Sequence, residues 1–105
     1  MKRRILRRIA AKRDLIEHFA HIGERNLDAA RQFRASAERA FKLLAEMPDV
    51  GVVKRLRNAS YGELRMWSIR EFPDRLIFYR FDESTIEIVR VLHARQDYRR
   101  IFAIE

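Results

Sequence analysis

Residues 26–51 read NLDAARQFRASAERAFKLLAEMPDVG, and the hydrophobic pattern changes within this one stretch. Up to the proline, apolar side chains recur every three or four residues, which is typical of an amphipathic helix. At Pro48 the recurrence stops, because the residue before a proline avoids helical backbone angles. The stretch therefore predicts a helix over 26–47 that begins at the cap residue Asn26. We expect three of its side chains to face the sheet and form the core: Phe33, Phe41 and Leu44.

The chain before this helix predicts a second helix and a strand. Over residues 11–24, Leu15, Phe19 and Ile22 fall at helical spacing, and Ile16 and Ala20 widen the apolar stripe. The connection between the two helices is short, so we expect them to pack as an antiparallel hairpin. Ahead of them, the apolar residues of Arg3–Ile9 lie among arginines and predict a short strand.

The chain after Pro48 is rich in β-branched and aromatic residues, which favours strands. Three strands are predicted, with turns between them, and a last helical turn is predicted over 94–103. The strands are Leu64–Ile69, Arg75–Phe81 and Thr85–His93, and the turns are Asn58–Gly62, Pro73-Asp74 and Asp82–Ser84. The sequence thus predicts one α+β domain over residues 1–105, in the order β-α-α-β-β-β. Its helical hairpin packs on one face of a small, twisted, mainly antiparallel sheet, and a short C-terminal helical segment follows.

Composition bounds the possible functions. Cysteine is absent, which excludes disulfides and thiolate metal sites, and the first residues lack the apolar run of a signal peptide or membrane span. We therefore expect a cytoplasmic protein without a membrane partner. The net charge is +8, and residues 1–13 carry seven bases and no acid. Most of the bases are arginines, whose planar fork suits an acidic protein or nucleic acid, although a solvated basic surface is the plain alternative.

Several local strings, in this order and spacing, resemble the ParE/RelE toxin superfamily of type II toxin–antitoxin systems. The resemblance spans about residues 5–102 and includes an ending of the form RVLH-x-R-Q-D. The strings are Ala11-x-x-Asp14-Leu15, Asn26–Phe33, Leu44–Gly51, Leu64–Ile69, Leu76–Arg80 and Ile88–Asp97.

The resemblance implies a toxin held inactive in a hetero-oligomer with a cognate acidic antitoxin, ParD-like or similar. In such pairs an amphipathic C-terminal segment of the antitoxin wraps the helical hairpin and the sheet of the toxin. ParE-like members inhibit DNA gyrase without chemistry of their own, whereas RelE-like members cut messenger RNA on the ribosome. The ParE-like ending favours gyrase inhibition, the RelE-like endoribonuclease stays open as the alternative, and no cofactor is implied.

Cleavage of RNA needs a general base, an acid and cations for the phosphorane charge. RelE-like members resemble one another in lysines on the first hairpin strand and a C-terminal tyrosine or histidine. Here no lysine follows Lys54, and Ile101 stands at the expected tyrosine position. We therefore expect no catalytic residue. Whether the protein is an enzyme stays open, but a non-enzymatic inhibitor is favoured. If the protein were a ribonuclease, its candidates would be Arg75, Arg95, His93 and Tyr98.

The same arginines can contact a target or an antitoxin. The expected contact residues are Arg65, Arg75, Arg90, Arg95, Arg99 and Arg100. For some of them the alternative is structural ion pairing with a strand carboxylate such as Glu87.

Two further hypotheses concern histidines and the N-terminal arginines. His18 and His21 lie one helical turn apart, but without a third ligand they predict surface histidines rather than a metal site. His93, which ends a strand, is expected to be a hydrogen-bonded structural residue. A plain nucleic-acid-binding module that uses the N-terminal arginines is the remaining alternative, although it lacks an evident groove-entering helix.

Overall fold

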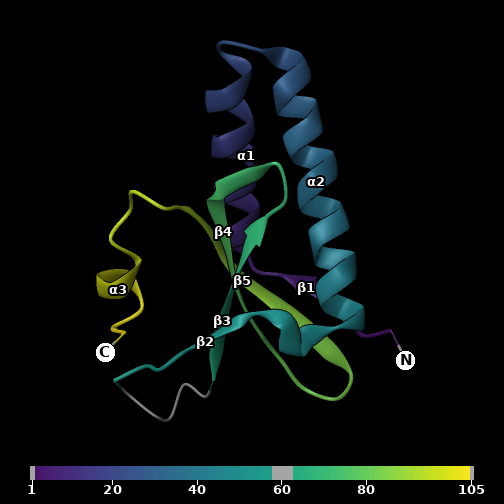
Figure 1. Cartoon of the computed structure of the whole chain (residues 1–105), viewed down its shortest axis with the longest axis vertical. Coiled ribbons are helices and arrows are strands. Elements are labelled where there is room, and N and C mark those ends of the chain that lie inside the picture. Colours follow the sequence, from purple (N-terminus) through teal and green to yellow (C-terminus); the bar gives the residue numbers. More distant parts are fainter. Residues whose placement is uncertain (1, 58–62, 105) are drawn as a thin grey trace.

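The computed structural model describes residues 2–57 and 63–104 and confirms the predicted α+β fold (Figure 1). The predicted turn Asn58–Gly62 lies outside the described residues. A helical hairpin follows the first strand, and a run of strands and a short helix complete the chain. The elements are β1 (Arg4–Arg7), α1 (Ile9–Gly23), α2 (Leu27–Glu46), the 3-10 turn η1 (Pro48–Val50), β2 (Val52–Lys54), β3 (Leu64–Ile69), β4 (Phe72–Phe81), β5 (Thr85–His93) and α3 (Tyr98–Ile101).

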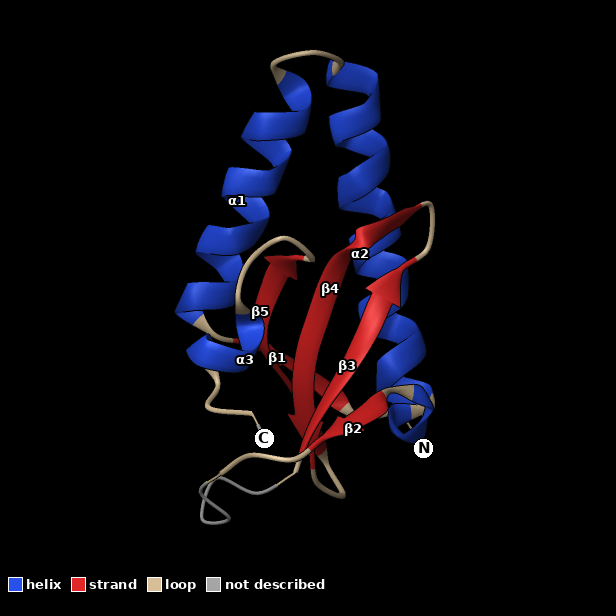
Figure 2. Ribbon diagram, turned by 60° about the vertical axis from the view of Figure 1, so that its left-hand side comes forward, coloured by secondary structure: helices blue, strands red, loops and turns tan. Residues whose placement is uncertain are grey.

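The strands form one five-stranded sheet in the order β1-β5-β4-β3-β2. Strand β1 runs parallel to β5, and the other neighbours are antiparallel. Figure 2 shows the hairpin of α1 and α2 covering one face of this sheet. The edge strand β2 was not predicted, because three residues are too few to show an alternating pattern.

Helix α2 is built as its sequence indicates. The side chain of Asn26 accepts a hydrogen bond from the backbone N–H of Ala29 at 3.0 Å, which satisfies one of the free donors at the helix start. Phe33, Phe41 and Leu44 are at most 1% exposed and form the core together with residues of β3, β4 and β5. The prediction that these three side chains face the sheet is confirmed.

The exit from α2 is held by one tyrosine. The hydroxyl of Tyr79 donates to the carbonyl of Pro48 at 2.7 Å and accepts from the N–H of Gly51 at 2.9 Å. Tyr79 is fully buried, and burial raises the pKa of its hydroxyl, so that it stays a donor. A Cβ atom at Gly51 would lie 2.3 Å from this hydroxyl, and only glycine therefore fits there.

The predicted turn at Pro73-Asp74 is wrong. The chain turns at Arg70 and Glu71, where Glu71 has a φ of 75°, and β4 already begins at Phe72. The ring of Phe72 packs edge-on against Phe33, with ring centres 5.4 Å apart, and this contact draws the strand start into the core. The register of the β3–β4 pair shifts at this point, so Pro73 lies in a bulge where no ladder hydrogen bond needs its missing N–H.

The second face of the sheet carries a smaller apolar cluster. Leu64, Leu76, Phe78, Leu92 and Ile104 form it. The rings of Tyr98 and Phe102 pack on Phe78 at 5.2 and 4.8 Å between centres, so the C-terminal segment covers this face. Over the described part of the chain, no helix combines the length and apolar character needed to cross a bilayer.

Candidate functional site

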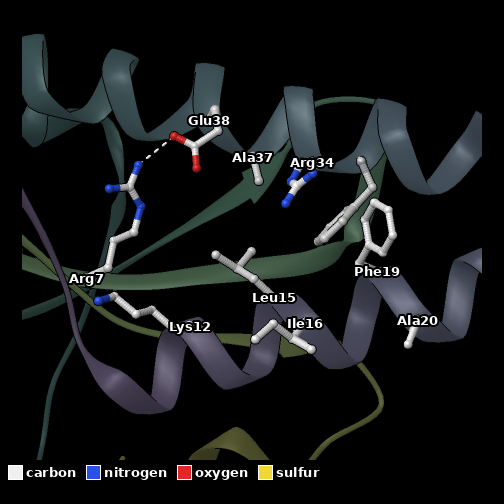
Figure 3. A pocket seen from close by; sticks show the side chains of 10 residues that line it. Arg7, Lys12, Leu15, Ile16, Phe19, Ala20, Arg34, Ala37 and Glu38 are labelled. Carbon is white, nitrogen blue, oxygen red and sulfur yellow. Dashed lines mark hydrogen bonds and ion pairs between the residues drawn. The ribbon is translucent and has the colours of Figure 1, made fainter.

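A groove of about 450 Å³ runs between α1 and α2 (Figure 3). Apolar side chains from both helices line it, and charged side chains stand at its rim. The apolar lining consists of Leu15, Ile16, Phe19, Ala20, Phe33 and Ala37, and the rim consists of Arg7, Lys12, Arg34 and Glu38.

The groove exists because the apolar stripe of α1 is wider than the surface that covers it. The residues that α1 buries are Ala11 and Asp14, which lie on its sheet side. Leu15 and Phe19 point into the space between the helices and are only half-buried, and Ile16 is 69% exposed. The widened stripe was visible in the sequence, and its outer residues line the open groove.

The rim of the groove is net positive. Arg7 forms an ion pair with Glu38, and its guanidinium also lies 5.3 Å from the ring centre of Phe41. The guanidinium of Arg34 lies 5.4 Å from the ring centre of Phe19, where the electron-rich ring face attracts a cation. With Lys12, the rim carries three bases and one acid, and that acid is paired.

Arg90, an expected contact residue, is partly buried and anchored by an ion pair. Its Nε and Nη2 donate to the two carboxylate oxygens of Asp14 at 2.7 and 2.8 Å, and the Asp14 side chain is 8% exposed. The same carboxylate accepts the N–H of Val91 at 3.0 Å. These bonds raise the pKa of Arg90 above its usual value. The pair joins α1 to β5, and the sequence did not indicate it; Glu87 pairs with Arg8 and Arg80 instead.

Arg75 is buried, in a network that includes two histidines. Its Nε donates to Nδ1 of His18 at 3.2 Å, and its Nη1 lies 2.8 Å from the carboxylate of Asp74. Because Nδ1 of His18 accepts, the ring proton is on Nε2, which donates to the carbonyl of Val91 at 2.9 Å. Burial of the ring lowers the pKa of His18. The expectation that His18 is a surface histidine is wrong, whereas His21 is exposed.

His93 is hydrogen-bonded within the protein, as its position at a strand end led us to expect. Its Nδ1 accepts the backbone N–H of Arg95 at 3.0 Å, and its Nε2 lies 3.1 Å from the carboxylate of Asp74. Both ring nitrogens are thus engaged in holding the turn after β5.

The four ribonuclease candidates do not come together in one site. Arg75 points to the face of the sheet that α1 covers, since it bonds to His18. Tyr98 packs on Phe78 in the cluster on the opposite face. The sheet therefore lies between a candidate cation and a candidate acid or base. Arg95 is exposed beside His93, and the structure brings only Arg75, His93 and Arg95 near one another.

The remaining contact candidates divide into braced and exposed arginines. Arg65 donates to the carbonyls of Asp49 and Gly51, both at 3.0 Å, and its side chain is 16% exposed. It therefore holds η1 to the sheet. Arg99 and Arg100 lie exposed on α3. Within residues 2–57 and 63–104, no three histidine or carboxylate side chains are grouped as metal ligands would be.

Comparison with known families gives one match. Residues 6–98 match the family model of the ParE toxin of type II toxin-antitoxin system, parDE. A search of curated proteins finds no match. The fold and the match together define a small α+β toxin, and the chain belongs to the ParE toxin family. It is thus the toxin of a type II toxin–antitoxin system, and the family implies an antitoxin partner. The resemblance noted in the sequence is confirmed.

Proposed function

We propose that this toxin inhibits DNA gyrase by binding alone, and that an acidic antitoxin of the ParD type neutralises it in the bacterial cytoplasm. The observation that carries the first half is the placement of Arg75 and Tyr98 on opposite faces of the sheet. A ribonuclease must bring a base, an acid and cations to one phosphodiester group. An inhibitor needs only a complementary surface.

The hydrogen bonds of the candidate groups support the same proposal. A general acid or base must exchange its proton with substrate, but His93 uses both ring nitrogens within the protein. Arg75, 6% exposed, is covered by its partners and cannot approach a phosphate without breaking them. Of the expected contact residues, we therefore assign contact with gyrase to three that are exposed: Arg95, Arg99 and Arg100. Arg65, Arg75 and Arg90 support the surface by holding the loops and helix in place.

The groove between α1 and α2 supports the second half of the proposal. Its apolar lining offers a binding surface for the apolar face of an amphipathic segment, as in other helix-in-groove complexes. Its rim of three bases and one paired acid favours acidic residues on the flanks of that segment. A stable toxin–antitoxin hetero-oligomer is therefore the expected resting form.

Two assays of the purified full-length toxin distinguish an endoribonuclease from a gyrase inhibitor. We expect inhibition of gyrase supercoiling and no cleavage of ribosome-bound messenger RNA. Codon-specific cuts that disappear in His93→Ala or Tyr98→Phe would overturn the proposal and make the protein an endoribonuclease.

The antitoxin site is tested by placing a carboxylate in the groove. Ile16→Glu changes an exposed lining residue and should leave the fold intact, yet it should repel an acidic segment. Leu27→Glu is the matched control, since Leu27 is 50% exposed and lies outside the groove. By calorimetry with the cognate antitoxin, Ile16→Glu should weaken binding about tenfold or more, equal to about 1.4 kcal/mol. Equal affinities of the two variants would exclude the groove as the site.

Charge steering predicts a salt dependence of the same complex. The association rate should fall between about 50 mM and about 500 mM salt, while the dissociation rate changes less. An association rate that stays flat over this range would contradict a role for the basic rim.

A further inference from the structure

Two side chains of α1 hold the backbone of β5 at Val91. The carboxylate of Asp14 accepts the N–H of Val91 at 3.0 Å, and Nε2 of His18 donates to the carbonyl of Val91 at 2.9 Å. The pairing of β1 with β5 ends at Ile88, so at Val91 these side chains provide the hydrogen bonds that a neighbouring strand would provide. We call these two contacts at Val91 the α1 latch.

The α1 latch requires a neutral His18 ring. Nε of Arg75 donates to Nδ1 of His18 at 3.2 Å, so this nitrogen must carry a lone pair. Arg75 is not free to move aside, because it is 6% exposed and its Nη1 lies 2.8 Å from the carboxylate of Asp74. A proton on Nδ1 would set two N–H donors against each other and bring two positive charges into contact. The ring would then have to turn out of the α1 latch.

Burial of the ring lowers the pKa of His18, and charged groups on three elements act on the ring as well. The carboxylate of Asp14 on α1 favours a proton, but two hydrogen bonds from Arg90 of β5 already engage that carboxylate. On β4, the carboxylate of Asp74 is engaged too, at 2.8 Å from a guanidinium and 3.1 Å from an imidazole. These two partners of Asp74 both disfavour a proton on the ring: Arg75 of β4 and His93 of β5.

The α1 latch and the groove share one helix. His18 stands between Leu15 and Phe19 along α1, and both of these line the groove. The His18 ring also packs edge-on against Phe33 of α2, another lining residue, with ring centres 5.8 Å apart. A displacement of the ring therefore moves the wall that α1 contributes to the groove and breaks a contact with the opposite wall.

We propose that the α1 latch is sensitive to acid: a proton on His18 releases α1 from β5 and weakens binding in the groove. The proposal rests on the proposed function for the occupant of the groove, the antitoxin. Because the pKa of His18 lies below its ordinary value of 6.5, the latch is closed at neutral pH and opens as the medium becomes acidic. Acidification of the cell would then favour release of the toxin.

The first test follows α1 in the full-length toxin alone by amide hydrogen exchange, corrected for the intrinsic effect of pH on the exchange rate. The proteins are wild type, His18→Gln and the control His21→Gln. Glutamine keeps one acceptor and one donor but takes up no proton. His21 is the matched control because it is exposed and lies one turn further along the same helix.

From about pH 7.5 to about pH 5.5, exchange of the α1 amides should rise at least about threefold in wild type and in His21→Gln, and stay nearly constant in His18→Gln. An equal rise in His18→Gln overturns the proposal. Wild type also provides a test without substitution, by nuclear magnetic resonance. The His18 ring and the α1 amides should titrate together, and midpoints more than about one pH unit apart overturn the proposal as well.

The second test measures the affinity for the cognate antitoxin by calorimetry at the same two pH values. Carboxylates of the antitoxin titrate alike with every variant, so the difference between variants isolates the ring. The fall in affinity should be at least about threefold larger for wild type than for His18→Gln, because only the latched fraction binds. Equal falls contradict the link between the α1 latch and the groove.

The variant Ile16→Glu tells the two possible failures apart. If it weakens binding at neutral pH and the falls are still equal, the groove is the antitoxin site and the acid-sensitive latch is refuted. If it binds like Leu27→Glu, the antitoxin site of the proposed function is wrong, and the exchange test alone decides whether the α1 latch opens in acid.

Discussion

The ion pair between Asp14 and Arg90 should contribute a large share of the stability of this small protein. Asp14→Ala removes an acceptor that is 8% exposed and receives three hydrogen bonds, two from Arg90 and one from the N–H of Val91. Breaking a buried pair by removing one partner costs about 3–5 kcal/mol. Arg90 is 29% exposed, so water can partly solvate it after the change. We therefore expect the free energy of unfolding to fall by about 3 kcal/mol, the lower end of this range.

Urea unfolding at neutral pH measures this loss, and a double-mutant cycle isolates the pair. The four proteins are wild type, Asp14→Ala, Arg90→Ala and the double variant. We expect a coupling free energy of about 2 kcal/mol. Asp28→Ala is the control, because the Asp28 side chain is 86% exposed and its pair with Arg31 should contribute less than about 0.5 kcal/mol.

The reasoning would be refuted by a loss below about 1 kcal/mol for Asp14→Ala, the value of an ordinary hydrogen bond. A coupling energy near zero would show that Asp14 acts on Val91 and not through Arg90. An unchanged urea slope is also required, because a changed slope would mean a different unfolded or native state.

Three more predictions concern the core, pH and the exit of α2. Phe41→Ala, at a fully buried site, should cost about 3–5 kcal/mol, and a melting temperature within a degree or two of wild type would contradict this. The pKa of His18 lies below its ordinary value of 6.5, so the unfolded chain binds a proton at a higher pH than the folded protein does. The contribution of this ring to the free energy of unfolding should therefore be complete above about pH 6.5 and decline as the pH falls below it. Melting curves from about pH 7.5 to about pH 5.5 should show a smaller decline in His18→Gln, and equal declines would exclude this ring. Gly51→Ala should lower the urea midpoint more than Tyr79→Phe does, since the added methyl group collides with the hydroxyl, and the reverse order would contradict the clash.

Most of the fold could be predicted because its determinants are local. The period of Phe33, Phe41 and Leu44 and the stop at Pro48 define α2 and its buried face. The turn after β3 could not be found in the same way. Pro73 and Asp74 are typical turn residues, but the packing of Phe72 on Phe33 decides the turn, and that contact joins residues far apart in the chain.

The site was less predictable than the fold for the same reason. The ion pair between Arg90 and Asp14 could not be predicted from the sequence, because it depends on how α1 crosses β5. Nor does the exposure of Ile16 follow from its place on an apolar stripe, since exposure depends on the angle between two helices. Residues that recognise a partner are placed by such long-range geometry.

The parallel pairing of β1 with β5 has a consequence for how the toxin is made. Strand β1 is synthesised before both helices and the other strands of the sheet, and its hydrogen-bond partners, Thr85 to Ile88, follow all of these but β5 itself. Local helical contacts can form early, but this edge of the sheet must wait for the last strand, and such long-range pairing slows folding. The packing of α1 on β5, including the Asp14–Arg90 pair, also cannot form before β5 is present. A growing chain therefore lacks this part of its surface until β5 has been translated, which leaves an interval in which the antitoxin can meet the toxin as it folds.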